Sequence, residues 1–304
     1  MSTVEIITGP GDDLATDAPP PRAGRAERPG GGARALARLL GSELRLVFLR
    51  PRNLVTLGLL AVVPVLLGIA VRAAGPGTGG RGGMIITQVA GNGLVLTFVS
   101  LFVLTPLLLP IAVAVVSGNT IAGEANGGTL RYLLTAPAGR TRLLVVKYAS
   151  VVVFCLAASL IVALSGLVTG LLMFPAGPMT LLSGVTVPVA DGLLRLVIVV
   201  GYVTAGMAAL GAVGLAVSTF TTAPVGAIAG TMSLVVTAQV LQAIPQLEWL
   251  RPYLLTNYLA DFDGALRAPI ETAELTQGLL VFAAYVVVFG SLAWARFTGR
   301  DVNC

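Results

Sequence analysis

From residue 54 onward, long apolar runs alternate with short polar segments. Each run holds about 20 residues rich in Leu, Val and Ala, the length that a helix needs to cross the hydrocarbon core of a bilayer. None shows the two-residue alternation typical of a membrane β-barrel strand. The runs are Leu54–Val71, Val95–Ser117, Tyr148–Phe174, Leu193–Ser218, Thr222–Ile244 and Thr276–Ala295. The pattern predicts an all-α, polytopic membrane protein with about six transmembrane helices.

Two different segments precede the first apolar run. Residues 1–33 are rich in Pro, Gly, Ala, Asp and Arg, a composition that predicts a disordered tail. In residues 34–52, arginines and leucines fall on opposite sides of a helical wheel, which predicts an amphipathic helix in the membrane interface. A soluble extension of the first span is the alternative. The remaining residues, 53–304, form one transmembrane domain.

Two of the polar connections also predict structure. Only Thr219–Thr221 separate the fourth and fifth runs, so these two spans should form a tight helical hairpin. The connection 246–275 places Trp249, Tyr253 and Phe262 among charged residues. Such a pattern favours short amphipathic helices at the outer leaflet over an ordinary extracellular loop.

The composition indicates that lipid surrounds much of the chain, and the distribution of charge indicates its orientation in the membrane. The chain is 56% hydrophobic and 11% charged, whereas a typical soluble domain is about 25% charged. Basic residues gather before the first run, in the loop 121–147 and after the last run, which predicts that both termini are cytoplasmic. The net charge of +5 therefore reflects topology, and we expect no nucleic-acid partner.

Several kinds of chemistry are missing from the sequence. The only lysine, Lys147, follows no glycine-rich phosphate loop, so the chain should not hydrolyse ATP itself. With no His and two Cys, we expect no metal site and no enzymatic activity. Arg195 is the one charged residue inside the predicted spans, near an end, where its side chain could snorkel to the interface. A proton-coupled carrier would normally need intramembrane acids.

The loop 121–147 carries the most specific pattern. Gly127 and Gly128 should end the second span, and Thr129–Thr135 should form a short helix that ends before Pro137. This helix presents Leu130, Leu133 and Leu134 on one face. A leucine face on so short a helix needs a cover. Either a soluble partner or the chain's own interfacial helix and lipid headgroups could provide it.

The run Ala122–Lys147 resembles the signature loop of ABC transporter permeases of the type-two exporter class. Its Gly-Glu, Gly-Thr-Leu, Leu-Leu-Thr-x-Pro and Arg-Thr-Arg-Leu-Leu-x-x-Lys elements carry the likeness. The interfacial helix, the six spans, the long first and short second cytoplasmic loops and the helical outer connection are similar to that family as well. The resemblance covers nearly all of the chain except residues 1–33.

The resemblance implies a mechanism in which the loop is a coupling helix seated in a separate ATPase subunit. The residues that it places at the ATPase are Glu124, Gly128, Thr129, Leu130, Arg131, Leu133, Leu134, Pro137 and Arg140. Glu124 would fix the angle of the helix through hydrogen bonds or ion pairs. The implied partners are two ABC ATPase subunits, which bind ATP and Mg, a second permease chain, identical or paralogous, and membrane lipid. This chain would bind no cofactor.

In that family the second and fifth spans line the path between the two permeases. The candidate path residues are Thr105, Pro106, Pro110, Thr231, Ser233 and Thr237, although hydroxyl residues in spans more often serve helix packing or bond back to the helix backbone. The uncharged spans favour export of a hydrophobic or amphipathic substrate across a bacterial plasma membrane. The rival functions are an ATP-independent channel or carrier and a non-transporting scaffold.

Overall fold

The computed structural model describes residues 31–74, 88–126, 140–181 and 183–299. Within this part of the chain, six helices are long and apolar enough to cross a membrane. They are α2 (Pro51–Ala74), α5 (Leu108–Asn126), α7 (Arg140–Met173), α8 (Val189–Phe220), α9 (Pro224–Ala243) and α11 (Thr272–Thr298). The predicted all-α, polytopic fold is confirmed. The protein is a multi-pass membrane protein.

Helix α8 forms the core of the bundle. It packs against α5, α7, α9 and α11, and 72% of its most apolar window is buried, against 17% for α9 and for α11. Its small residues permit this close packing, since added Cβ atoms at Gly206 and Gly211 would fall 2.7 Å from neighbouring side chains. Helices α9 and α11 therefore present most of their apolar surface outward.

The second span is interrupted, where the sequence predicts one kinked helix. Helix α4 (Gly93–Leu104) stops at a turn over 105–107 before α5 begins. Pro106 has no backbone N–H to continue the helix, whereas Pro110 lies in the first turn of α5, where proline is tolerated. Across the turn, the Gln239 side chain of α9 donates a hydrogen bond to the Pro106 carbonyl at 2.6 Å. A polar side chain thus satisfies a carbonyl that the broken helix leaves open.

Glycines bring α4 and α7 into backbone contact. A Cβ atom on Gly170 would overlap the carbonyl oxygen of Gly93, and one on Gly166 would lie 3.0 Å from the Thr97 Cα atom. This is the close approach that the Gly166–Gly170 spacing predicts. The same four-residue spacing occurs at Gly226 and Gly230 on α9. There Gly230 faces Val217 of α8, while Gly226 meets only the connecting residues Thr221 and Ala223.

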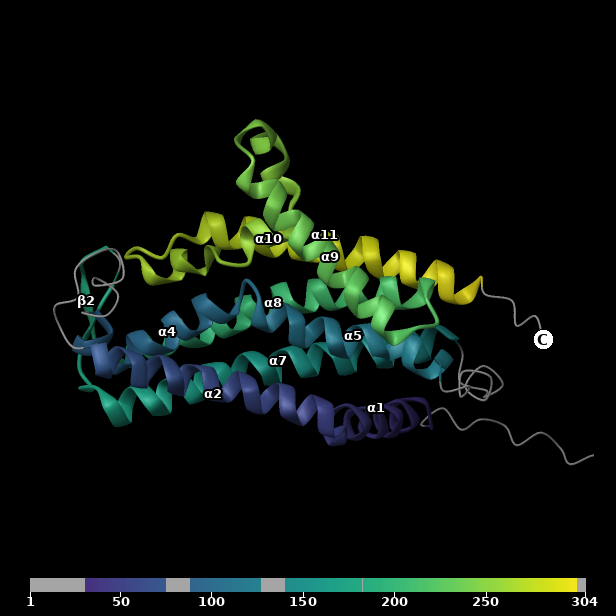
Figure 1. Cartoon of the computed structure of the whole chain (residues 1–304), viewed down its shortest axis with the longest axis horizontal. Helices are drawn as coiled ribbons and strands as arrows, with labels where there is room; N and C mark the ends of the chain where they lie inside the picture. Colours follow the sequence, from purple (N-terminus) through teal and green to yellow (C-terminus); the bar gives the residue numbers. More distant parts are fainter. Residues whose placement is uncertain (1–30, 75–87, 127–139, 182, 300–304) are drawn as a thin grey trace, which may run out of the picture.

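Most of the connections lie at the two ends of the bundle, as Figure 1 shows. Helix α1 (Gly31–Leu49), the end of α5, the start of α7, the α8–α9 turn and the end of α11 share one end. The antiparallel pair β1 (Met179–Thr180) and β2 (Thr186–Val187) lies at the other. Residues 221–223 alone join α8 to α9, so the predicted tight hairpin is confirmed.

The predicted helices between the last two spans are also present. They are η1 (Pro245–Tyr253), α10 (Leu255–Tyr258) and η2 (Asp261–Leu266). Trp249 and Tyr253 on η1 are each 68% exposed, whereas Tyr258 and Phe262 are buried against the bundle. The segment is thus anchored at its second half, while η1 projects from the bundle (Figure 1).

The α4–α7 contact predicts a position-specific effect on stability. Gly170→Ala should lower the free energy of unfolding by about 1–3 kcal/mol, because α4 and α7 must separate to admit the new methyl group. Gly290→Ala on α11 is the matched control, since no atom lies within 4 Å of its Cβ position. Alanine is favoured over glycine inside a helix, so the control should be neutral or slightly stabilising. SDS titration of the purified variants measures both, and equal stabilities would contradict the contact.

Candidate functional site

The only lysine of the sequence lies inside the bundle. Lys147, on α7, is 2% exposed, and its ammonium group is paired with carboxylates of the protein. It donates a hydrogen bond to Glu43 Oε1 on α1 at 3.2 Å and makes a second, short ion pair with Glu124 Oε1 on α5. Three separate helices therefore meet at one charge.

The surroundings of this cluster are polar but almost closed. Arg50, Asn53 and Asn119 help to line a cavity of about 30 Å³ beside it, which is large enough to hold a water molecule. The Asn53 amide is buried and donates to the Val47 carbonyl at 2.7 Å, which ties the start of α2 to the end of α1. The cluster therefore fixes α1 against the spans at two points.

The cluster is positioned beside the segment 127–139. Glu124 precedes the end of α5 at Asn126, and Lys147 follows the start of α7 at Arg140 by about two helical turns. The Glu124–Lys147 pair thus joins the two helices that enter and leave this segment. Removing one partner of such a buried pair leaves an uncompensated charge, so α5 and α7 cannot separate here at low cost.

The structure places only part of the predicted ATPase-contact set. Glu124 makes the ion pair described above, and its side chain is 16% exposed. Arg140 begins α7, but its side chain lies outside the described residues. The other predicted contacts also lie outside them: Gly128, Thr129, Leu130, Arg131, Leu133, Leu134 and Pro137. Their contact with an ATPase stays a prediction.

The predicted path residues divide into two groups. Thr105 and Pro110 are buried and Pro106 is exposed at the break between α4 and α5. On α9, Thr231 is fully buried and donates to the Ala227 carbonyl at 2.8 Å, which is a packing arrangement. Ser233 and Thr237 are exposed on the same helix. The break and α9 are adjacent through the Gln239–Pro106 bond, although Thr231 itself faces packed helices.

A second polar cluster lies toward the other end of the bundle. Arg195, near the start of α8, is 6% exposed. Its guanidinium donates to Asp191 at 3.0 Å and to the carbonyls of Ala265 and Arg267 at 2.6 and 2.8 Å. These acceptors lie close enough to satisfy the charge inside the protein. Arg195 therefore anchors η2 to α8.

Comparison with known proteins gives one family. A family model described as "Protein of unknown function (DUF2705)" matches residues 84–303, which is most of the chain. The chain belongs to this family. No curated protein matches the sequence. The DUF2705 match includes Glu124 and Lys147 but begins after α1. Glu43 therefore contributes to the cluster from outside the matched region.

Sequence reasoning found Glu124 in this DUF2705 chain but missed its partners. Lys147 lies 104 residues from Glu43 and 23 from Glu124, so no local pattern joins them. One signal was present, because Glu43 is the only acid of the amphipathic helix and Lys147 is the only lysine of the chain. Two such isolated opposite charges beside apolar runs are candidates for a pair.

The connection between α9 and α11 carries a group with a shifted pKa. Burial raises the pKa of the half-buried Asp261 carboxyl on η2 to about 6, with smaller contributions from the charges of Asp263 and Glu274. Asp263 itself is paired with Arg267 at 3.2 Å. The folded state therefore favours protonated Asp261, and ionisation of this carboxyl at neutral pH costs stability.

The ion cluster predicts a large loss of stability when its centre is removed. Lys147→Met leaves two carboxylates without their cation and should lower the free energy of unfolding by about 3–5 kcal/mol. The triple variant Glu43→Gln, Glu124→Gln, Lys147→Met carries no charge at the site and should recover most of this loss. SDS unfolding in mixed micelles measures both variants. A Lys147→Met protein as stable as the wild type would refute a buried, paired lysine.

The Asp261 carboxyl predicts a pH-dependent effect. Asp261→Asn should stabilise the protein at pH 8 by about 1 kcal/mol, a value reduced for solvent screening of a half-exposed group. The gain should shrink as pH falls through 6 and disappear below 4, where Asp261 is protonated in both states. Thermal unfolding between pH 4 and 8 tests this. Asp263→Asn is the control and should give no gain at pH 8, because it breaks an ion pair.

Proposed function

We propose that this chain is the membrane subunit of an ABC exporter, driven by ATP hydrolysis in a separate ATPase subunit. The segment 127–139 would bind the ATPase, with Leu130, Leu133 and Leu134 as the contact face. Two permease chains, identical or paralogous, would assemble with two ATPase chains. The chain would lie in a bacterial plasma membrane with both termini in the cytoplasm.

The observation that carries this proposal is the ion cluster of Lys147, Glu43 and Glu124. A docking segment can transmit force only if the helices at its two ends move together. The Glu124–Lys147 pair joins α5 to α7 directly beside that segment, and Glu43 adds α1. A displacement of 127–139 would therefore move three helices as one unit.

Two further features support an externally driven exporter. The sequence has no phosphate loop, so the energy for ATP-driven transport must come from another chain. Arg195 is already satisfied by protein groups, and the acids of the spanning helices, Glu124, Asp191 and Glu274, lie near helix ends, which disfavours a proton-coupled carrier. The apolar character of the spans favours a hydrophobic or amphipathic substrate.

Copurification tests the proposal. The tagged chain is expressed together with a candidate ABC ATPase encoded by a neighbouring gene, and the ATPase recovered is measured. Leu130→Asp with Leu134→Asp should reduce recovery at least about tenfold, since burying an unpaired charge at a contact costs more than 1.4 kcal/mol. Tyr132→Asp is the matched control, because helical spacing places residue 132 opposite the leucine face, and its recovery should be retained.

Two results would overturn the docking assignment. One is failure of the wild-type chain to recover any ATPase. The other is full recovery by the double leucine variant. If the ATPase binds, stimulation of ATP hydrolysis by a transported substrate supports export, whereas hydrolysis that no lipid or amphipathic compound alters favours a scaffold.

A further inference from the structure

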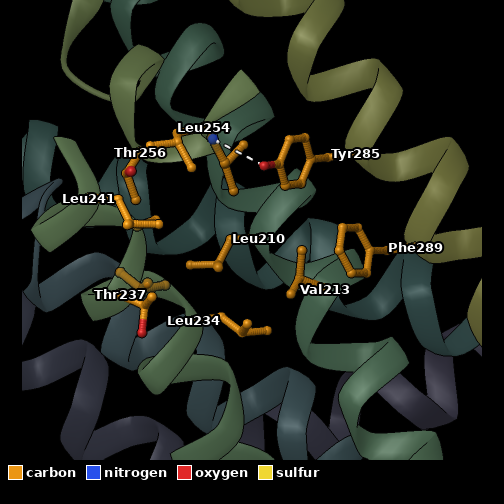
Figure 2. Close-up of a pocket in the computed structure, with 12 residues that line it drawn as sticks. Leu210, Val213, Leu234, Thr237, Leu241, Leu254, Thr256, Tyr285 and Phe289 are labelled. Atoms are coloured by element: carbon orange, nitrogen blue, oxygen red, sulfur yellow. Dashed lines mark hydrogen bonds between the residues drawn. The ribbon is translucent and has the colours of Figure 1, made fainter. Parts of the chain in front are cut away.

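A cavity of about 210 Å³ lies between α8, α9, α10 and α11. Figure 2 shows Tyr285 and Phe289 on one side of it, Thr237, Leu241 and Thr256 on the other, and Leu210 between them. The lining is almost wholly apolar. It comes from the spans α8, α9 and α11 and from α10 in the connection between α9 and α11.

The chemistry of the lining selects an apolar occupant. An apolar cavity of about 150 Å³ engineered into a protein stays dry and accepts benzene, because water finds no hydrogen-bond partners there. The present cavity is larger and lies between membrane-spanning helices, where lipid is the surrounding solvent. An acyl chain is therefore the apolar group available to enter it.

The cavity has a closed floor and an accessible wall. Leu210 and Val213 of α8 are 2% and 4% exposed, so they form its floor. Leu234 of α9 lines the cavity but is 49% exposed, so it marks the side that communicates with the bilayer. A chain entering past Leu234 would end against α8.

Tyr285 holds the remaining side in place. Its hydroxyl donates to the Tyr253 carbonyl at 2.8 Å and accepts from the Leu255 N–H at 3.3 Å, and its ring stacks on Phe289 with centroids 5.6 Å apart. Helix α10 is thereby fixed above the cavity. A wall held by both backbone hydrogen bonds and ring packing gives the cavity a definite shape.

We propose that this cavity binds one acyl chain of a phospholipid from the surrounding bilayer. The site belongs to the single chain and does not rest on the exporter function. It assigns a lipid ligand to α8, α9, α10 and α11.

Photocrosslinking in liposomes tests the site on the full chain alone, without ATPase or ATP. The probe is a phosphatidylcholine with a diazirine on one acyl chain, and the labelled peptides are mapped by mass spectrometry. We expect labelling of the floor residues Leu210 and Val213, which are closed to bulk lipid. Leu234→Trp should reduce this labelling at least about fivefold by filling the entrance, a loss of about 1 kcal/mol in affinity.

Matched controls separate the cavity from the general lipid-facing surface. Val236→Trp lies on the same helix, is 47% exposed in the wild type and does not line the cavity, so labelling should be retained.

The outcomes that overturn the proposal are distinct. Labelling confined to outward residues would show that no chain enters the cavity. Equal losses for Leu234→Trp and Val236→Trp would show that the entrance is not specific. Thermal unfolding of each variant confirms that it is folded.

Discussion

The buried ammonium group of Lys147 is the constraint on which one end of this molecule depends. Leaving a charge unpaired in an apolar bundle would cost several kcal/mol, so both of its carboxylate partners must stay in place. Glu43 and Glu124 come from α1 and α5, whereas Lys147 is on α7. The position of α1, the angle of α5 where it ends and the start of α7 therefore follow from a single electrostatic requirement.

The same requirement explains the other polar features of the bundle. Where lipid is the solvent, each opened backbone group needs a partner within the protein. Gln239 donates a hydrogen bond to the Pro106 carbonyl at the break in the second span. Arg195 of α8 donates to two carbonyls of the connection between α9 and α11. Polar residues are few in these helices, but Lys147, Gln239 and Arg195 each join elements that are distant in the sequence. Together with the glycine contacts, these polar interactions fix the arrangement of the apolar helices.

Local sequence was sufficient for the elements and insufficient for the pairings. Long apolar runs and the three-residue connection after Ser218 predicted the spans and the α8–α9 hairpin, because helix length and turn position are local properties. Pro106 and Pro110 predicted a disturbance of the second span but not its complete interruption, since that also depends on Gln239 of α9 as a distant partner. The acceptors of Arg195 could not be predicted for the same reason: Ala265 and Arg267 are 70 and 72 residues away.

The central claim is that this cluster couples an ATPase-binding segment to the spans, and it can be tested by separating binding from coupling. ATP hydrolysis by the bound ATPase is measured in liposomes with wild-type chain and with the uncharged variant Glu43→Gln, Glu124→Gln, Lys147→Met. The account predicts that the variant still binds the ATPase through 127–139 but no longer changes its hydrolysis rate as the wild type does. A variant that binds the ATPase and changes its rate to the wild-type extent would contradict the claim.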